Sequence, residues 1–209
     1  MDEEEFSFIG ILSSDVRQAL ARLDESNTPS DRRNALRTII SAAEGLAWVF
    51  RNHVVSIART VDDLAPLVEM AFAETAVFVS EQGKIVPQAR HLSMTALVRL
   101  TINVAQSMVP AIGVDFGVPG WNDLKLSIKI RNRVTHPKIG KDLLVSGHDI
   151  EIAKSGFVWL AGMVADVMEH TNRILSDHAA LGRELIEELR KGDPDALALL
   201  QRVHDERDD

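Results

Sequence analysis

The chain has 209 residues, no cysteine and a formal net charge of −8, and 45% of its residues are hydrophobic. This length and hydrophobic content predict one compact domain with a sizeable core. The lack of cysteine excludes disulfides, thiolate metal sites and a cysteine nucleophile. The first residues, MDEEEFSF, are acidic where a signal peptide would be basic, and the chain contains no run of 18 apolar residues. We therefore expect a cytoplasmic protein that does not enter a membrane.

The N-terminal segment, residues 1–27, is acidic. It contains seven acidic residues and two arginines, and only a short helical pattern from about Val16 to Leu23. Segments at a chain end with this charge are commonly solvated and poorly ordered. We therefore expect a partly disordered tail that carries one short helix.

A strong helix start follows at residues 28–31, which read TPSD. Threonine caps the helix, proline suits the first helical position, and early negative charge favours the helix N-terminus. Apolar residues then recur at spacings of three and four, which predicts one long amphipathic helix to about Ala58. The run Arg-Asn-His at 51–53 is interpreted as part of the solvated face of this helix.

The middle of the chain predicts two more helices. One begins at residue 62 or 63 and continues through Phe78, and the other runs from about Leu92 to Met108 and lies centrally. Between them, residues 81–88 carry Gly and Pro and are expected to form a connecting loop. The glycine- and proline-rich run 109–120 lacks Walker spacing, so we interpret it as a loop that shapes the entry to the next helix.

Residues 121–141, WNDLKLSIKIRNRVTHPKIGK, predict the helix around which the chain is organised. At 100° per residue its leucines, isoleucines and Val134 share one broad arc, and Arg131 falls in the middle of that arc. Arginine is rarely buried without a partner, because desolvating an unpaired charge is costly. Arg131 therefore requires an anion, which is either a carboxylate of the protein or a ligand.

Asn132 and His136 lie four residues apart, so they are neighbours on one edge of this helix. Pro137 should end the helix at His136. An imidazole there is suited to proton transfer near neutral pH. The stretch from Lys125 to Lys141 contains six basic residues and no acidic one, although the whole chain is acidic. These features together indicate a site for a phosphate ester.

The run Arg131-Asn132-x-x-x-His136 resembles the R-[polar]-x-x-x-H signature of the HEPN superfamily, whose all-helical domains are common in prokaryotic toxins and defence systems. The flanking runs at 135–138, 142–146 and 156–160 (THPK, DLLVS and GFVWL) look similar too. The resemblance implies a homodimeric bundle of four or five helices. It also implies a metal-independent ribonuclease that cuts RNA at a cleft between two copies of the motif helix, without a cofactor.

By the same resemblance, His136 moves a proton, Arg131 holds or stabilises the phosphate, and Asn132 orients the site. Among the neighbouring cations we expect Lys129, Arg133 and Lys138 to bind the substrate. The expected partners are RNA, a second copy of the chain, and an antitoxin or another defence-system protein.

Other interpretations remain open. The chain is alternatively a non-catalytic interaction or nucleotide-binding module, or a purely structural helical protein. Arg131 alone can pair with a core carboxylate, and His136 alone can cap a helix. Trp121 can stack on a base, but we expect it to anchor packing.

The C-terminal part of the chain predicts a helix that starts at Ser146 or Asp149, with Gly156 and Gly162 allowing another helix to approach closely. Its polar residues Asp166, Glu169 and His170 have metal-compatible spacing but are interpreted as an exposed stripe. No serine-nucleophile elbow, zinc-protease motif or dinucleotide fingerprint occurs.

Residues 181–209 are highly charged, with a break and restart at 192–195 and a last helix too short to stand alone. We therefore predict an all-α fold. It consists of a HEPN-like bundle of about five main helices over residues 28–180, followed by a C-terminal helical extension over residues 181–209.

Overall fold

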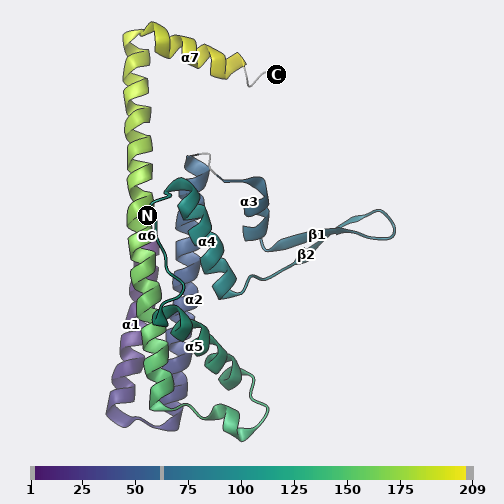
Figure 1. The fold of residues 1–209 in the computed structure, drawn as a ribbon, viewed down its shortest axis with the longest axis vertical. Coiled ribbons are helices and arrows are strands. Elements are labelled where there is room, and N and C mark those ends of the chain that lie inside the picture. The colour runs from purple at the N-terminus through teal and green to yellow at the C-terminus, as the bar shows by residue number, and fades with distance from the viewer. Residues whose placement is uncertain (1–2, 62–63, 206–209) are drawn as a thin grey trace.

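The computed structural model describes residues 3–61 and 64–205, and their side chains from residue 8 onward. This part of the chain is mostly helical (77%) and contains one small two-stranded hairpin. The elements, shown in Figure 1, are α1 (Glu3–Ser26), α2 (Pro29–Thr60), α3 (Pro66–Phe72), β1 (Thr75–Val79), β2 (Ile85–Ala89), α4 (Met94–Met108), α5 (Pro119–Thr135), the 3₁₀ helix η1 (Gly140–Leu143), α6 (Gly147–Lys191) and α7 (Pro194–Asp205). The prediction of a helical fold is thus confirmed, and the prediction of all-α structure is wrong at the hairpin.

Helix α2 is the centre of the bundle and contacts α1, α4, α5 and α6. The predicted start is confirmed: the Thr28 hydroxyl accepts a hydrogen bond from the Asp31 N–H (3.2 Å), and the Asp31 carboxylate accepts one from the Thr28 N–H (3.0 Å). This reciprocal arrangement satisfies backbone donors that a helix start otherwise leaves free. The apolar face of α2 is buried over its whole length, including Leu36, Ile39 and Phe50. The predicted long helix is therefore present and ends at Thr60.

Helix α1 is much longer than the short helix expected in the N-terminal segment. It runs from Glu3 to Ser26 and packs along α2. Val16 is buried, and half-buried leucines at three and four residue spacings pack against the same core, namely Leu12, Leu20 and Leu23. The expected partly disordered tail is therefore wrong from residue 3 onward, because this apolar stripe is covered by α2. Residues 1–2 lie outside the described part of the chain.

Glycine allows α5 and α6 to approach closely. A Cβ atom built on Gly156 in α6 would lie 2.6 Å from the backbone of Leu124 in α5, and one built on Gly120 would lie 2.5 Å from Trp159. These separations are far shorter than van der Waals contact. The predicted close approach is confirmed at Gly156. It is wrong at Gly162, where a Cβ would have nothing within 4 Å.

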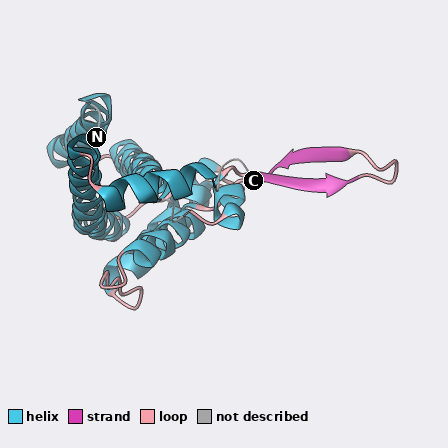
Figure 2. Cartoon of the chain, turned by 90° about the horizontal axis from the view of Figure 1, so that it is seen from above, coloured by secondary structure: helices cyan, strands magenta, loops and turns pink. Residues whose placement is uncertain are grey.

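The segment before α4 differs most from its prediction. Helix α3 ends at Phe72, which is buried in the core, and Glu74 adopts a positive φ of 52° that turns the chain out of the helix. Strand β1 then pairs antiparallel with β2, so the predicted helix is wrong beyond Phe72. The predicted loop at 81–88 is confirmed over residues 81–84 and wrong from Ile85 onward, where β2 begins. The hairpin projects away from the helices, as Figure 2 shows. The predicted helix start at residue 62 or 63 lies outside the described residues.

Helix α6 starts as predicted, because the Ser146 hydroxyl accepts a hydrogen bond from the Asp149 N–H (3.1 Å). It continues without a break past residue 180, where the bundle was expected to end, and rises beyond the other helices in Figure 1. Gly192 ends it with a positive φ of 74°, which confirms the predicted break. Helix α7 follows and packs on α6 through the buried Ala196. None of the described helices is long and apolar enough to cross a membrane.

Candidate functional site

The C-terminal end of α5 carries the predicted motif. The helix ends at Thr135, and His136 caps it while donating its backbone N–H to the carbonyl oxygen of Asn132 (3.0 Å). The side chains of Asn132 and His136 are exposed. Pro137 follows directly, as expected for a residue that cannot continue a helix. The structure therefore presents an amide and an imidazole to solvent at this helix end.

Arg131 points to a different side of α5. Its guanidinium forms an ion pair with the carboxylate of Glu44 in α2, and the Arg131 and Glu44 side chains are 22% and 43% exposed. Positions five apart on an α-helix differ by about 140° around the axis. Within the described residues no hydrogen bond or ion pair joins Arg131 and His136. The anion that Arg131 requires is therefore a carboxylate of its own chain.

Two arginines of α2 extend the cationic end of α5. Arg37 donates a hydrogen bond to the carbonyl oxygen of Val134 (3.4 Å), and Arg33 donates one to that of Leu143 (3.5 Å). Arg33, Arg37 and Glu44 share a face of α2, because spacings of four and seven return to the same side of a helix. None of the three was predicted from the sequence as part of a site. Their spacing was visible, but nothing in the sequence says that this face meets α5.

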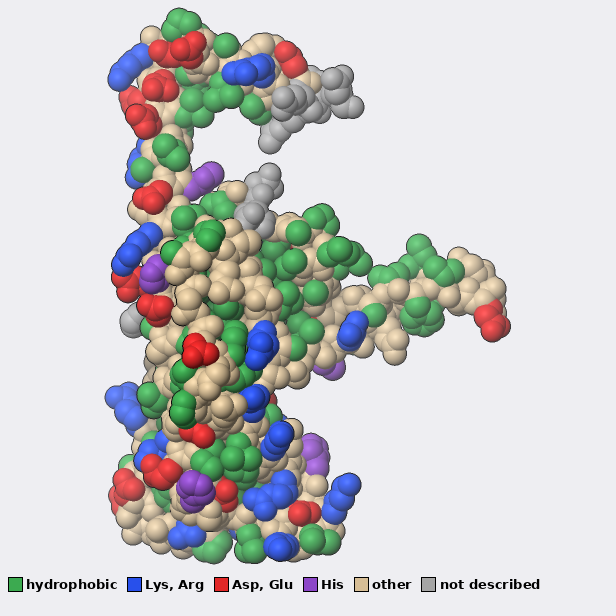
Figure 3. All heavy atoms as spheres, in the orientation of Figure 1, with side chains coloured by type: hydrophobic (Ala, Val, Ile, Leu, Met, Phe, Trp, Pro, Cys, Tyr) green, Lys and Arg blue, Asp and Glu red, His purple; other side chains and the backbone are tan. Residues whose placement is uncertain are grey.

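The charges around His136 are mainly positive. Lys129 and Lys138 are exposed, and Arg133 donates a hydrogen bond to the carbonyl oxygen of Leu144 (2.9 Å). Figure 3 shows Lys and Arg side chains gathered over the lower end of the molecule, where Figure 1 places α5 and η1. We call the set of residues here the α5-end surface; its members are Arg33, Arg37, Lys129, Asn132, Arg133, His136 and Lys138.

One carboxylate, that of Asp142, has a structural role beside this surface. It accepts hydrogen bonds from the backbone N–H groups of Lys138 (2.8 Å) and Ile139 (3.1 Å). These hydrogen bonds lower the pKa of Asp142, and the nearby positive charges of Arg133 and Lys138 lower it further. Asp142 therefore stays ionised near neutral pH and fixes the turn that follows His136, which takes the form of the 3₁₀ helix η1.

Two other predicted roles can be compared with the structure. Trp121 is buried and packs against the rings of Phe116 (4.8 Å between centroids) and Trp159 (5.4 Å), which confirms packing in place of base stacking. In α6, the carboxylate of Glu169 pairs with Arg173. Within the described residues no group of three or more His, Asp or Glu side chains is arranged to hold a metal ion.

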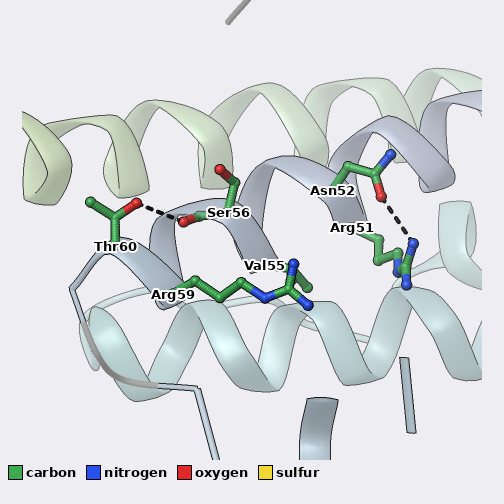
Figure 4. Close-up of a pocket in the computed structure, with 6 residues that line it drawn as sticks. All are labelled: Arg51, Asn52, Val55, Ser56, Arg59 and Thr60. Atoms are coloured by element: carbon green, nitrogen blue, oxygen red, sulfur yellow. Dashed lines mark hydrogen bonds between the residues drawn. The ribbon is translucent and has the colours of Figure 1, made fainter. Parts of the chain in front are cut away.

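A separate pocket of about 410 Å³ lies along α2 (Figure 4). Several of its polar groups have partners within the chain: Arg51 donates to the Asn52 side chain (3.0 Å) and to the carbonyl oxygen of Phe72 (2.6 Å), and Arg59 pairs with Glu69. The buried Nε of Arg51 has no hydrogen-bond partner among the described residues. The interpretation of residues 51–53 as a solvated face is wrong at His53, whereas Arg51 and Asn52 are half-buried and line this pocket. His53 is buried between α2 and α6, because this part of α2 is covered by α6.

Comparison of the chain with protein-family models, with curated proteins and with solved structures finds no match. Function is therefore inferred from the residues and from the geometry of the α5-end surface.

Proposed function

We propose that the chain is a metal-independent endoribonuclease of the HEPN type that acts on RNA as a homodimer. The observation that carries the proposal is the exposure of His136 and Asn132 at the end of α5. The cations of the α5-end surface support it, because Lys and Arg side chains supply most of the affinity of proteins for nucleic-acid backbones. The two arginines of α2 add to this support, since they lie beside the motif helix and come from a distant part of the sequence.

The proposed reaction is an attack of the ribose 2′-oxygen on the adjacent phosphorus. His136 takes the proton of the 2′-hydroxyl, the 2′-oxygen bonds to phosphorus, the bond between phosphorus and the 5′-oxygen breaks, and the leaving 5′-oxygen takes a proton from water. The products are a 2′,3′-cyclic phosphate and a 5′-hydroxyl. Negative charge that develops on the phosphoryl oxygens is stabilised by the guanidinium groups of the site. Because Arg131 and His136 face different sides of α5, the proposal requires that a second copy complete the cleft.

In this proposal the ion pair with Glu44 holds the Arg131 side chain in one position. A partner protein that covers the α5-end surface, such as an antitoxin, would block access to His136. Its contact residues would be acidic, because the surface that it covers is cationic.

A second candidate function is a non-catalytic module that binds RNA or a nucleotide. The ion pair between Arg131 and Glu44 favours it, because a guanidinium already paired with a carboxylate is less available to a phosphate. In this alternative His136 and its neighbouring cations contact phosphate without proton transfer.

The deciding experiment is cleavage of a labelled single-stranded RNA in EDTA. The nuclease proposal predicts cleavage by the wild type and a loss of about 100-fold or more in His136→Ala, which is the usual contribution of a general acid or base. His91→Ala is the matched control, because His91 is exposed but lies at the end of the hairpin, and it should cleave as the wild type does. Equal cleavage by all three proteins would contradict the assignment of His136.

The same proteins separate the two candidates. Absence of cleavage by a folded wild type, together with RNA binding that weakens steeply with salt, would favour the binding module. Absence of both cleavage and binding would remove RNA as the ligand of the α5-end surface.

A further inference from the structure

The β1–β2 hairpin is an isolated ribbon with exposed apolar side chains. Val77, Val79 and Ile85 are 53%, 69% and 74% exposed, and Phe78 is 47% exposed. Within the described residues the sheet contains only these two strands. A two-stranded hairpin is only marginally stable in water, and three or more strands are normally needed. The arrangement in Figures 1 and 2, where the ribbon stands clear of the helices, leaves its edges accessible.

The hydrogen bonds of the hairpin define which backbone groups point outward. The Ser80 N–H donates to the carbonyl oxygen of Lys84 (2.9 Å), and the Arg90 N–H donates to that of Glu74 (2.7 Å). Hydrogen-bonded pairs alternate along an antiparallel ladder. The pairs in register between these two, at positions 75 and 89, 77 and 87, and 79 and 85, are therefore the non-hydrogen-bonded ones. Their backbone groups point away from the ribbon.

The two edges of the ribbon differ in what they offer. The outer edge of β2 has Pro87 at its centre, and proline has no N–H to donate. The outer edge of β1 presents the N–H and carbonyl groups of Thr75, Val77 and Val79, none of which is a proline. Natural proteins protect sheet edges with proline, so the hairpin has one protected edge and one open edge.

We propose that β1 pairs antiparallel with β1 of a second copy, with Val77 opposite Val77 of the partner subunit. The result is a four-stranded sheet with β1 strands in the centre and β2 strands at the edges. Such a contact is self-complementary, as a two-fold dimer requires. Pro87 at both outer edges stops further strands from adding, so pairing through the hairpin closes at two copies.

The charge pattern fits this pairing. Strand β1, with sequence TAVFV, carries no charge, so its self-pairing opposes no like charges. In the antiparallel register Glu74 lies opposite Ser80 of the partner subunit and Glu81 lies opposite Ala73. A parallel pairing would instead place two Glu74 carboxylates side by side. The occupant of the open edge is therefore a second copy in antiparallel orientation.

The β1 contact uses none of the residues of the α5-end surface, so it is a second contact between copies, separate from the one that the proposed ribonuclease function requires. Its tests read association and not RNA cleavage. Failure of one proposal therefore leaves the other to be tested separately.

The first test uses disulfide formation, because the chain has no native cysteine. Directly opposed residues of an antiparallel pair have Cα atoms about 5.5 Å apart, within the range that a disulfide spans. We expect Val77→Cys to form a covalent dimer under mild oxidation. The matched control, Ile85→Cys, is more exposed than Val77 but lies on the outer strand, and it should form no covalent dimer. Failure of Val77→Cys to cross-link, or equal cross-linking of both variants, would overturn the proposal.

The second test uses sedimentation of unmodified and proline variants. Val77→Pro removes an outward N–H of β1 without breaking a hydrogen bond inside the hairpin, and Ile85→Pro does the same on β2. We expect Ile85→Pro to form assemblies of the same size as the wild type and Val77→Pro to form assemblies of half that size, because only the β1 contact is lost. A monomeric wild type at the highest attainable concentration, or equal sizes of Val77→Pro and the wild type, would contradict pairing through β1.

Discussion

Two segments of the chain combine Arg, Asn and His, at residues 51–53 and 131–136, and the fold places them in opposite environments. His53 is 8% exposed, and its Nε2 lies 3.1 Å from the hydroxyl of Thr171. Burial lowers the pKa of His53. His136 is exposed at the end of α5, beside cations from α5 and α2.

The presence of Arg, Asn and His in a short segment therefore does not by itself define a functional site. The 51–53 run lies inside a long helix whose face is covered by α6, so its histidine contributes to packing. The 131–136 run lies at the C-terminal end of α5. Pro137 prevents the helix from continuing, so no further helical turn covers His136. Two features distinguish His136 from the structural His53: its position at a helix end, and the cations of a second helix near it.

The largest expected effects differ between the two histidines: substitution of His136 should reduce RNA cleavage, and substitution of His53 should reduce stability. His136→Ala should lose RNA cleavage by about 100-fold or more while its melting temperature is unchanged, because the side chain is exposed. His53→Ala should lose about 1–3 kcal/mol of stability, because it removes a buried side chain and leaves the Thr171 hydroxyl with one partner fewer. Its cleavage per folded molecule should equal that of the wild type. Thermal unfolding and RNA cleavage, measured on both variants, check this; loss of cleavage in folded His53→Ala would break the contrast.

The packing of α5 against α6 can be disturbed without a substitution at either histidine. Gly156→Ala should lower the free energy of unfolding by about 1–3 kcal/mol, because the new Cβ meets the Leu124 backbone and must displace α5. Gly162→Ala is the control in the same helix: it meets nothing within 4 Å, and alanine is the better helix former, so stability should stay equal or rise. Urea unfolding of both variants measures the difference. Equal stability of the two would show that α5 and α6 are not held at this contact.

The buried histidine should make stability depend on pH. The pKa of His53 is lowered from 6.5 by burial, so the unfolded chain binds a proton at a pH where the folded chain does not. Above pH 6.5 His53 is neutral in both the folded and the unfolded state, and its contribution to the free energy of unfolding is fully present. As the pH falls below 6.5, the unfolded state gains a proton first, so the folded state loses stability relative to it. We expect His53→Gln to show a smaller loss of stability than the wild type between pH 7.5 and pH 5.5, which lies above the range of the carboxyl groups. Parallel curves for the two proteins would contradict this origin.

The smallest expected effect concerns Arg131. The ion pair with Glu44 is partly exposed, so a double-mutant cycle with Glu44→Gln and Arg131→Gln should give a coupling free energy of about 0.5–1 kcal/mol that decreases with salt. The cycle removes the separate effect of each substitution. Zero coupling at low salt would mean that Glu44 does not hold Arg131 in solution.

Local features of the fold could be predicted from the sequence, because they depend on neighbouring residues. Thr28 and Ser146 cap helices, and Gly192 ends one, through hydrogen bonds and backbone angles set within a few positions. The hairpin could not be predicted in this way. Val77 and Phe78 continue an apolar spacing that suits a helix equally well, and the choice of strand depends on the turn around Gly83, which has a positive φ of 72°.

The candidate site likewise has features that neighbouring residues determine and features that depend on contacts between distant helices. Pro137 and the four-residue spacing were enough to place Asn132 and His136 together at a helix end. The need of Arg131 for an anion was also predictable, but not its partner, because Glu44 lies 87 residues away. The position of Arg33 and Arg37 beside the motif could not be predicted for the same reason, because contacts between distant helices are fixed by packing and leave no local pattern in the sequence.

The most direct test of the central claim is the chemical form of the ends that the protein makes from single-stranded RNA in EDTA. We expect 2′,3′-cyclic phosphate and 5′-hydroxyl ends from the wild type, no cleavage where the 2′-hydroxyl is methylated, and product reduced by about 100-fold or more from His136→Ala. Ends with a 5′-phosphate, cleavage of the methylated RNA, or undiminished products from His136→Ala would contradict 2′-hydroxyl attack at the α5-end surface.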